Sequence, residues 1–169
     1  GVFASRYFPG VGAWMAPFVA WGKPVWGHYL AGVLTAIAVL GIGRELASNG
    51  VGLLAGLLTA AAPGMALFSN LLLSHHPTLA GLSVFVYWFL RMQRTGVLGC
   101  GLLAGLGLSL AMLCRPLTAA AVGFPFGCWL AWWWIRGDGE GSIGSRHARV
   151  AFVGVPVLIG LAATGWYNH

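Results

Sequence analysis

Charged residues are scarce in this sequence. They make up 7% of the 169 residues, whereas hydrophobic residues make up 59% and the mean hydropathy is +0.83. In a typical soluble domain about a quarter of the residues are charged. A chain with so few charges cannot cover a water-exposed surface, which excludes an ordinary soluble domain. We therefore expect lipid to be the solvent for most of this chain.

Acidic residues are the rarest charged type. Only Glu45, Asp138 and Glu140 are acidic, against nine Lys and Arg, so the formal net charge is +6. The basic residues stand mostly singly between apolar runs and form no cluster of the kind that binds nucleic-acid phosphates. The sequence therefore predicts no nucleic-acid partner, and its positive charge indicates basic loops on one membrane face.

Cysteine is also sparse, and no leader segment is visible. Cys100, Cys114 and Cys128 are an odd number in apolar surroundings, which argues against a disulfide framework and predicts packing residues. Residue 1 is Gly, no charged segment precedes a short apolar core, and no polar tail follows Trp166. We expect the chain to be an internal fragment of a longer protein.

Long apolar runs dominate what is present. A helix of about 20 apolar residues spans the hydrocarbon of a bilayer, and four of the runs qualify. The two shorter ones can be extended by flanking polar residues that reach the interface. The six runs are Tyr29–Gly43, Val51–Leu73, Pro77–Leu90, Thr95–Cys114, Pro116–Ile135 and Val150–Tyr167.

The expected fold class is all-α, a polytopic transmembrane helical bundle with about six or seven spanning or interfacial helices. Residues 1–169 form one transmembrane domain. Within it, residues 1–28 form an outer-face segment, where the prolines and aromatics of Phe8–Gly22 favour a helix lying along the interface. Residues 29–167 hold about six membrane helices, and 136–149 form a cytoplasmic loop.

Basic residues are distributed unevenly between alternate breaks. One side holds six of them and the other holds only Arg6, Lys23 and Arg115. By the positive-inside rule the richer side is cytoplasmic, so Arg115 and the opening segment face the periplasm or lumen. The six cytoplasmic residues are Arg44, Arg91, Arg94, Arg136, Arg146 and Arg149.

Small residues four positions apart predict close helix contacts within lipid. These sets are Gly52/Gly56, Gly101/Gly105/Ser109 and Gly123/Gly127. Proline also lies in the middle of two runs, at Pro63 and Pro125, where it predicts kinks.

Arg115 is the most specific candidate for chemistry. It stands directly between two apolar runs, where a guanidinium is costly unless it meets an anion or water. Arginine forms bidentate contacts with phosphate oxygens, so a lipid-linked phosphate is a natural partner. Snorkelling to ordinary headgroups is the alternative explanation.

His75 and His76 are predicted at the same outer end as Arg115. Neighbouring side chains on a helix point about 100° apart, so two adjacent histidines make a poor bidentate metal pair. They form either a polar interfacial turn or a group in which one imidazole binds a phosphate or sugar, or contributes to a metal site. Arg6, beside Tyr7, offers a second cation on this side.

All three acids fall on the predicted cytoplasmic side. A general base must lie within hydrogen-bond reach of the proton it takes. If catalysis occurs at the outer face, its carboxylate has to come from outside this chain, and the chain alone is expected to be inactive.

The combined motifs resemble a known enzyme class. Tyr7-Phe8-Pro9-Gly10 opens an aromatic segment, a later run ends in Ser74-His75-His76-Pro77, an Arg-x-x-Arg turn follows, and a glycine-rich run leads into Arg115-Pro116. This order resembles the polyprenyl-phosphate-dependent GT-C membrane glycosyltransferases, in the branch of aminoarabinose transferases, protein mannosyltransferases and RgtA/B/C/D-like domains.

The resemblance implies an integral-membrane enzyme, in the bacterial inner membrane, that passes a sugar from a polyprenyl-phosphate donor to a lipid, glycan or protein acceptor on the outer face. It implies that Arg115 and His75 or His76 bind the lipid phosphate, that Arg6 and Tyr7 contribute, and that the acidic catalytic residue precedes Gly1. No cofactor or metal ligand is assigned, although a divalent metal is compatible with such chemistry. The alternatives are a transporter or flippase half, or a structural membrane subunit.

Overall fold

The computed structural model describes residues 8–69, 73–136 and 143–167. Over these residues the secondary structure is entirely α-helical, with no strand, as the sequence predicted. The helices are α1 (Pro9–Ala20), α2 (Val25–Leu46), α3 (Asn49–Ala61), α4 (Pro63–Ser69), α5 (His75–Thr95), α6 (Leu98–Cys114), α7 (Pro116–Arg136) and α8 (Ile143–Tyr167).

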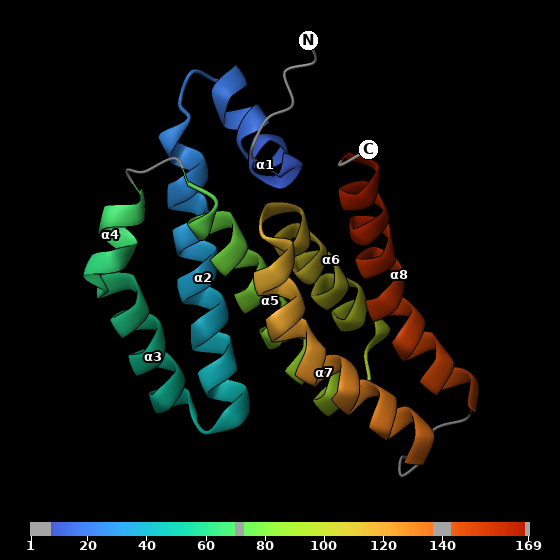
Figure 1. Cartoon of the computed structure of the whole chain (residues 1–169). Helices are drawn as coiled ribbons and strands as arrows, with labels where there is room; N and C mark the ends of the chain where they lie inside the picture. The colour runs from blue at the N-terminus through green and yellow to red at the C-terminus, as the bar shows by residue number, and fades with distance from the viewer. Residues whose placement is uncertain (1–7, 70–72, 137–142, 168–169) are drawn as a thin grey trace.

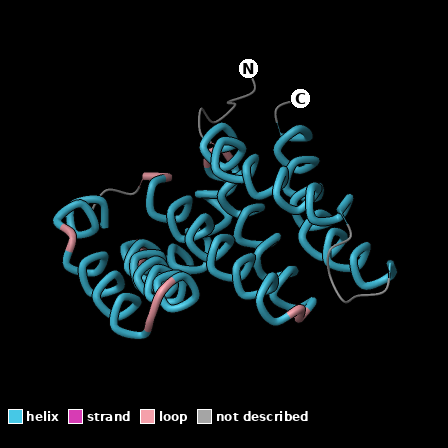
Figure 2. Tube along the Cα trace, turned by 90° about the horizontal axis from the view of Figure 1, so that it is seen from below, coloured by secondary structure: helices cyan, strands magenta, loops and turns pink. Residues whose placement is uncertain are grey.

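The helices form a row (Figure 1). Helices α2, α5 and α7 run in one direction, and α3, α6 and α8 run in the opposite direction. In this row α3 packs on α2, α2 on α5, α5 on α6 and α6 on α8, while α7 lies mainly against α6. Viewed from below, the same helices lie side by side along the row (Figure 2). The short helix α1 crosses the end at which α2 begins and contacts both α2 and α6. Helices α3 and α4 together make one traverse.

Two of the helices are long and apolar enough to cross a membrane. They are Val25–Leu46, which is α2, and His147–Tyr167, which is most of α8. Two shorter apolar helices, Asn49–Ala61 and Leu98–Cys114, fall below that length. The structure therefore supports an all-helical chain that associates with a membrane through α2 and α8.

Local sequence signals explain several helix ends. The Ser48 hydroxyl caps α3 by accepting a hydrogen bond of 3.3 Å from the Val51 amide. Gly96 ends α5 with a φ of 71°, a left-handed conformation that glycine adopts without steric cost. Pro63 breaks the run outright, because Ala62 before it is extended and α4 starts anew at the proline. By contrast, α7 continues through Pro125.

Glycines set the closest helix contacts. A Cβ on Gly81 would lie 2.6 Å from the Gly107 carbonyl oxygen, and a Cβ on Gly105 would lie 2.5 Å from the Val153 carbonyl oxygen. On α3, a Cβ on Gly52 would lie 2.5 Å from the Leu40 carbonyl oxygen. The predicted close approach of helix backbones is therefore confirmed at Gly52, Gly56 and Gly105, whereas a Cβ on Gly101 would meet only side chains.

The same prediction was wrong for Gly123/Gly127. A Cβ on Gly127 would meet nothing within 4 Å, and one on Gly123 would meet only the side chain of Leu108. These two glycines do not bring helix backbones together. They instead leave space beside α6, since both line an apolar cavity that is described below.

Two further expectations need correction. The loop expected at 136–149 is shorter, because α7 ends at Arg136 and α8 already begins at Ile143. The first turns of α8 contain Ala and Arg, which are good helix formers. Cys100 and Cys114 are buried, as predicted for packing residues, but Cys128 is exposed on α7. A small apolar side chain carries no signal of which helix face it occupies.

Candidate functional site

Arg115 lies at the break between α6 and α7. The residue before a proline is disfavoured in the helical region, and Arg115, which precedes Pro116, has φ −150° and ψ 85°. Its amide still donates to the Ala111 carbonyl at 2.7 Å, and its carbonyl accepts from the Ala119 amide at 3.0 Å. The Arg-Pro sequence thus ends one helix, starts the next, and holds the guanidinium-bearing residue at the corner.

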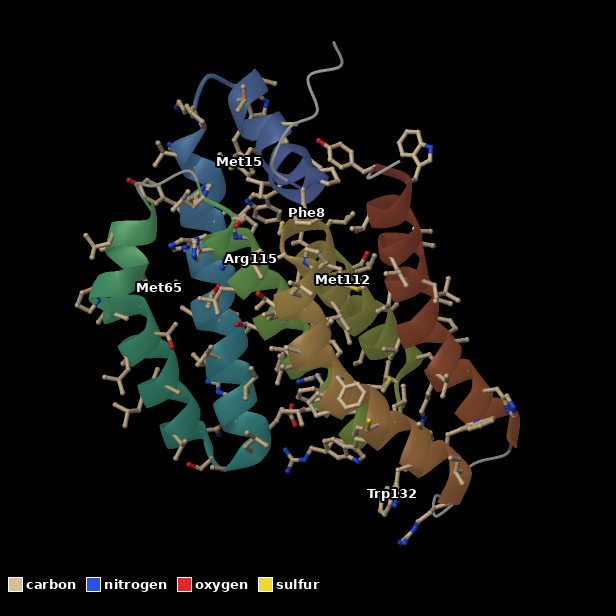
Figure 3. All side chains as sticks on the ribbon, viewed as in Figure 1. Phe8, Met15, Met65, Met112, Arg115 and Trp132 are labelled. Carbon is tan, nitrogen blue, oxygen red and sulfur yellow. The ribbon has the colours of Figure 1, made fainter. Side chains whose placement is uncertain are left out.

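A cavity of about 280 Å³ opens at this corner. Its walls come from the start of α1, the approach to α5, the end of α6 and the start of α7. The lining residues are Phe8, Val11, Ser74, Cys114, Arg115, Pro116, Leu117 and Thr118. Figure 3 shows Phe8 and Arg115 at the same end of the molecule, far from Trp132 at the opposite end.

The start of α7 adds positive character to the cavity. The first amides of a helix lack intrahelical acceptors and carry a partial positive charge. Leu117 and Thr118 belong to this first turn and line the cavity beside Arg115. A guanidinium next to a helix N-terminus is an arrangement that favours an anion such as phosphate.

Helix α1 is held firmly over this end of the molecule. A Cβ on Gly10 would lie 2.5 Å from the Leu113 carbonyl carbon, so only glycine allows α1 to approach α6 this closely. The Trp14 indole donates a hydrogen bond of 2.9 Å to the Gly27 carbonyl of α2. These contacts fix Phe8 and Val11 as one wall of the cavity.

The histidines occupy a second place at the same end. His76 is 2% exposed, and its ring faces His28 of α2, with ring centroids 5.8 Å apart. His76 also forms a hydrogen bond with the Met65 backbone.

The structure separates some of the predicted site residues. Ser74 lines the Arg115 cavity, whereas His75 and His76 are absent from its wall. His76 instead packs against α2 beside His28, a residue that the sequence analysis did not select. Arg6 and Tyr7 lie outside the described residues.

The opposite end of the row holds several arginines. Glu45 at the end of α2 pairs with Arg94 at 2.9 Å and with Arg91 at 3.5 Å, both at the end of α5. Arg149 in the first turns of α8 approaches Gly96, where a Cβ would lie 2.8 Å from its Nη2. The grouping of these cations at one end agrees with the partition read from the sequence.

Acidic residues are missing from the Arg115 end within the described part of the chain. Glu45 is at the far end of α2, and Asp138 and Glu140 fall outside the described residues. No group of three or more His, Cys, Asp or Glu side chains that could hold a metal is found among residues 8–69, 73–136 and 143–167. The described site can bind an anion, but it shows no carboxylate base.

A second cavity was not anticipated from the sequence. It measures about 320 Å³ and lies among α5, α6, α7 and α8, with nearly all of its wall formed by carbon. It forms where small residues of α7 lie opposite phenylalanines of α5. The sequence alone does not show which helices are neighbours, so it does not predict this cavity. Its lining includes Phe85, Phe89, Met112, Ala119, Gly123 and Val157.

Comparison with known proteins identifies no relative: no family model, no curated protein and no solved structure matches this chain.

Proposed function

We propose that this chain is part of an integral-membrane glycosyltransferase of the GT-C type. The enzyme takes a sugar from a polyprenyl-phosphate donor and passes it to a lipid, glycan or protein acceptor at the outer face of a bacterial inner membrane. The observation that carries the proposal is the Arg115 cavity, which combines a guanidinium, a helix N-terminus and apolar walls at one end of a helical row.

The outer surface of the row supports a polytopic arrangement. Exposed large apolar residues cover α3, where Leu54 is 59% and Leu58 63% exposed, and α8, where Leu158 is 63% and Ile159 64% exposed. Contiguous apolar surface of this kind is unfavourable in water and favourable in lipid. In the proposed arrangement α2, α3–α4, α5, α6, α7 and α8 all cross the bilayer, and α1 lies along its outer surface.

The charges at the two ends support the orientation. Arg44, Arg91, Arg94 and Arg149 lie toward the end that we assign to the cytoplasm, in agreement with the positive-inside rule. Arg115 then faces outward, at the level where a lipid-linked phosphate lies. Its helix-breaking Pro116 places it at the edge of the apolar region rather than in its centre.

The proposed chemistry at Arg115 is stabilisation of the leaving group. When the glycosidic bond to the donor breaks, negative charge develops on the polyprenyl phosphate. Arg115 and the first amides of α7 are positioned to receive that charge in a partly enclosed cavity, where such interactions are stronger than in water. His75, Arg6 and Tyr7 are further candidates for donor contacts, whereas His76 is buried beside His28 away from the cavity wall.

The test uses membranes that contain the full-length protein and a polyprenyl phosphate carrying a radiolabelled sugar. A transferase consumes the donor and moves the label to an acceptor. Solute movement across sealed vesicles without donor consumption would instead identify a transporter. Neither activity, with the protein intact in the membrane, would leave only a structural role.

A further inference from the structure

Two histidine rings meet inside the bundle with their Nδ1 atoms unsatisfied. His28 is fully buried and His76 is 2% exposed, and neither Nδ1 atom has a hydrogen-bond partner. A buried polar atom without a partner costs free energy, typically about 1–3 kcal/mol. Such an atom in a native core calls for an explanation, and here two of them belong to rings whose centroids lie 5.8 Å apart.

The other ring nitrogen of each histidine is already engaged. His28 Nε2 lies 2.9 Å from the Leu73 carbonyl oxygen, and His76 is hydrogen-bonded to the Met65 backbone. A carbonyl only accepts, so His28 Nε2 carries the proton and His28 Nδ1 presents a bare lone pair. The same holds for His76, since its Nδ1 has no partner and Nε2 must be the donor.

This pattern is the one found in histidines that bind metals. A metal-binding imidazole usually donates its second N–H to a backbone carbonyl or carboxylate, which fixes the tautomer and the ring orientation. Here two rings from different helices are both fixed in that way, with centroids 5.8 Å apart and planes inclined at 52°. With metal–nitrogen bonds of about 2.0 Å, this spacing suits one ion between the rings in a bent geometry.

Gly32 and Met65 complete the surroundings. Gly32 follows His28 by one turn of α2, and a Cβ placed on it would lie 3.8 Å from His76 Nδ1 and 3.5 Å from the Met65 methyl group. His76 Nδ1 and the Met65 methyl group therefore both lie within 4 Å of the same point on the face of α2. Met65 projects from α4, which forms the outer wall here (Figure 3).

The charge of the surroundings selects the ion. Both imidazoles are neutral ligands, and the only acid among the described residues, Glu45, is 17 positions along α2, about 25 Å away at 1.5 Å per residue. A buried dication without a carboxylate would carry two uncompensated charges, which is very costly. A monovalent soft ion has half that charge, and thioether and imidazole ligands suit copper in its lower oxidation state.

We propose that His28 and His76, with Met65 beside them, form a binding site for Cu(I). The ion bridges α2 and α5 near the outer end of the bundle and satisfies both unpartnered nitrogens. The site is separate from the Arg115 cavity and does not depend on glycosyl transfer. A side chain at Gly32 would contact both His76 and Met65 beside this site.

The test is an anaerobic titration of the purified chain in detergent with Cu(I), using a coloured Cu(I) chelator as competitor. The expected result is one ion bound per chain and an increase in the thermal unfolding temperature, since a ligand that binds only the folded state stabilises it. X-ray absorption should show nitrogen ligands with imidazole scattering, and a sulfur contribution that Met65→Leu removes.

Two variants remove one ligand each in different ways. His28→Gln keeps an amide donor for Leu73 but lacks the lone-pair nitrogen, and His76→Ala removes the ring. Each should weaken Cu(I) binding by more than the ~10–100-fold cost of losing an outer-shell partner. His147→Ala, an exposed histidine on α8, is the matched control and should bind as the unmodified chain does.

Far-UV circular dichroism verifies that each variant keeps its helices. Binding by a folded His28→Gln variant that equals that of the unmodified chain would overturn the proposal. So would failure of the unmodified chain to take Cu(I) from the chelator. Tight binding of Zn²⁺ with no binding of Cu(I) would contradict the assignment to a monovalent ion.

Discussion

Arg94 of α5 donates a hydrogen bond of 2.9 Å to Glu45 of α2, across 49 positions of sequence. Arg91, one turn earlier, lies 3.5 Å from the other carboxylate oxygen. A single acid thus joins the ends of two neighbouring helices at the cation-rich end of the row. The pair is partly solvated, because the Arg94 side chain is 66% exposed and that of Glu45 13%.

Replacing Glu45 with Gln should therefore lower the free energy of unfolding only modestly, by up to about 1 kcal/mol. The loss should shrink as salt is added, because the interaction is partly exposed to solvent. Thermal unfolding followed by circular dichroism at low and high salt measures both effects. A loss that is independent of salt would show that Glu45 acts through packing instead.

Gly81→Ala should destabilise the chain by about 1–3 kcal/mol, the usual cost of overpacking a tight contact. The new Cβ would lie 2.6 Å from the Gly107 carbonyl oxygen and 3.0 Å from the Ala111 amide nitrogen, so α5 and α6 would have to separate. Denaturation in mixed micelles measures the change.

The matched control is Gly127→Ala on α7, where a new Cβ would meet nothing within 4 Å. This substitution should be neutral or stabilise by up to about 1 kcal/mol, because alanine favours a helix over glycine. Equal losses of unfolding free energy in both variants would contradict the view that Gly81→Ala acts through the tight α5–α6 contact.

Cys128 distinguishes lipid from water around α7. It is exposed on the protein surface, whereas Cys100 and Cys114 are buried. Because a thiol reacts as its thiolate, and lipid disfavours both the thiolate and a charged reagent, Cys128 should resist a membrane-impermeant maleimide in native vesicles. It should react after solubilisation and unfolding. Rapid labelling in intact vesicles would place α7 in water.

The orientation can be tested with one cysteine at each end, in a Cys128→Ser background. Lys23→Cys lies at the Arg115 end and Asn49→Cys at the Glu45 end, and both positions are exposed. In right-side-out vesicles an impermeant reagent should label the first and spare the second, and inverted vesicles should reverse the result. Equal labelling of both from one side would contradict the proposed crossing of α2.

The sequence predicted the helical elements well because apolar runs and helix breakers are local signals. Each apolar run corresponds to one traverse of the structure, and Arg115-Pro116 marked the corner where α6 ends and α7 begins. The predicted helix in Phe8–Gly22 is observed as α1 (Pro9–Ala20), and its location at an interface stays a prediction. Close helix packing, by contrast, was predicted only in part, since Gly105 meets a neighbouring backbone and Gly127 does not.

The residues that the sequence did not reveal depend on which helices are neighbours. His28 looks like a polar residue at the edge of an apolar run, and nothing local connects it with His76, 48 positions later. The apolar cavity likewise requires Gly123 of α7 to face Phe85 of α5. The sequence held one local hint of the histidine pair. Gly32 follows His28 by one helical turn, so that face of α2 has no side chain at Gly32 where His76 approaches.

The most direct measurement of the proposed function is sugar transfer by the full-length protein carrying Arg115→Ala. We predict a loss of about 100-fold or more, comparable with removal of a donor that stabilises developing negative charge. Arg115→Lys should retain part of the activity, because lysine keeps the charge but not the bidentate geometry. Lys23→Ala, a cation at the same end but outside the cavity, should transfer sugar as the unmodified enzyme does. Unchanged transfer by a normally expressed Arg115→Ala variant would contradict the role of this cavity in holding the lipid phosphate.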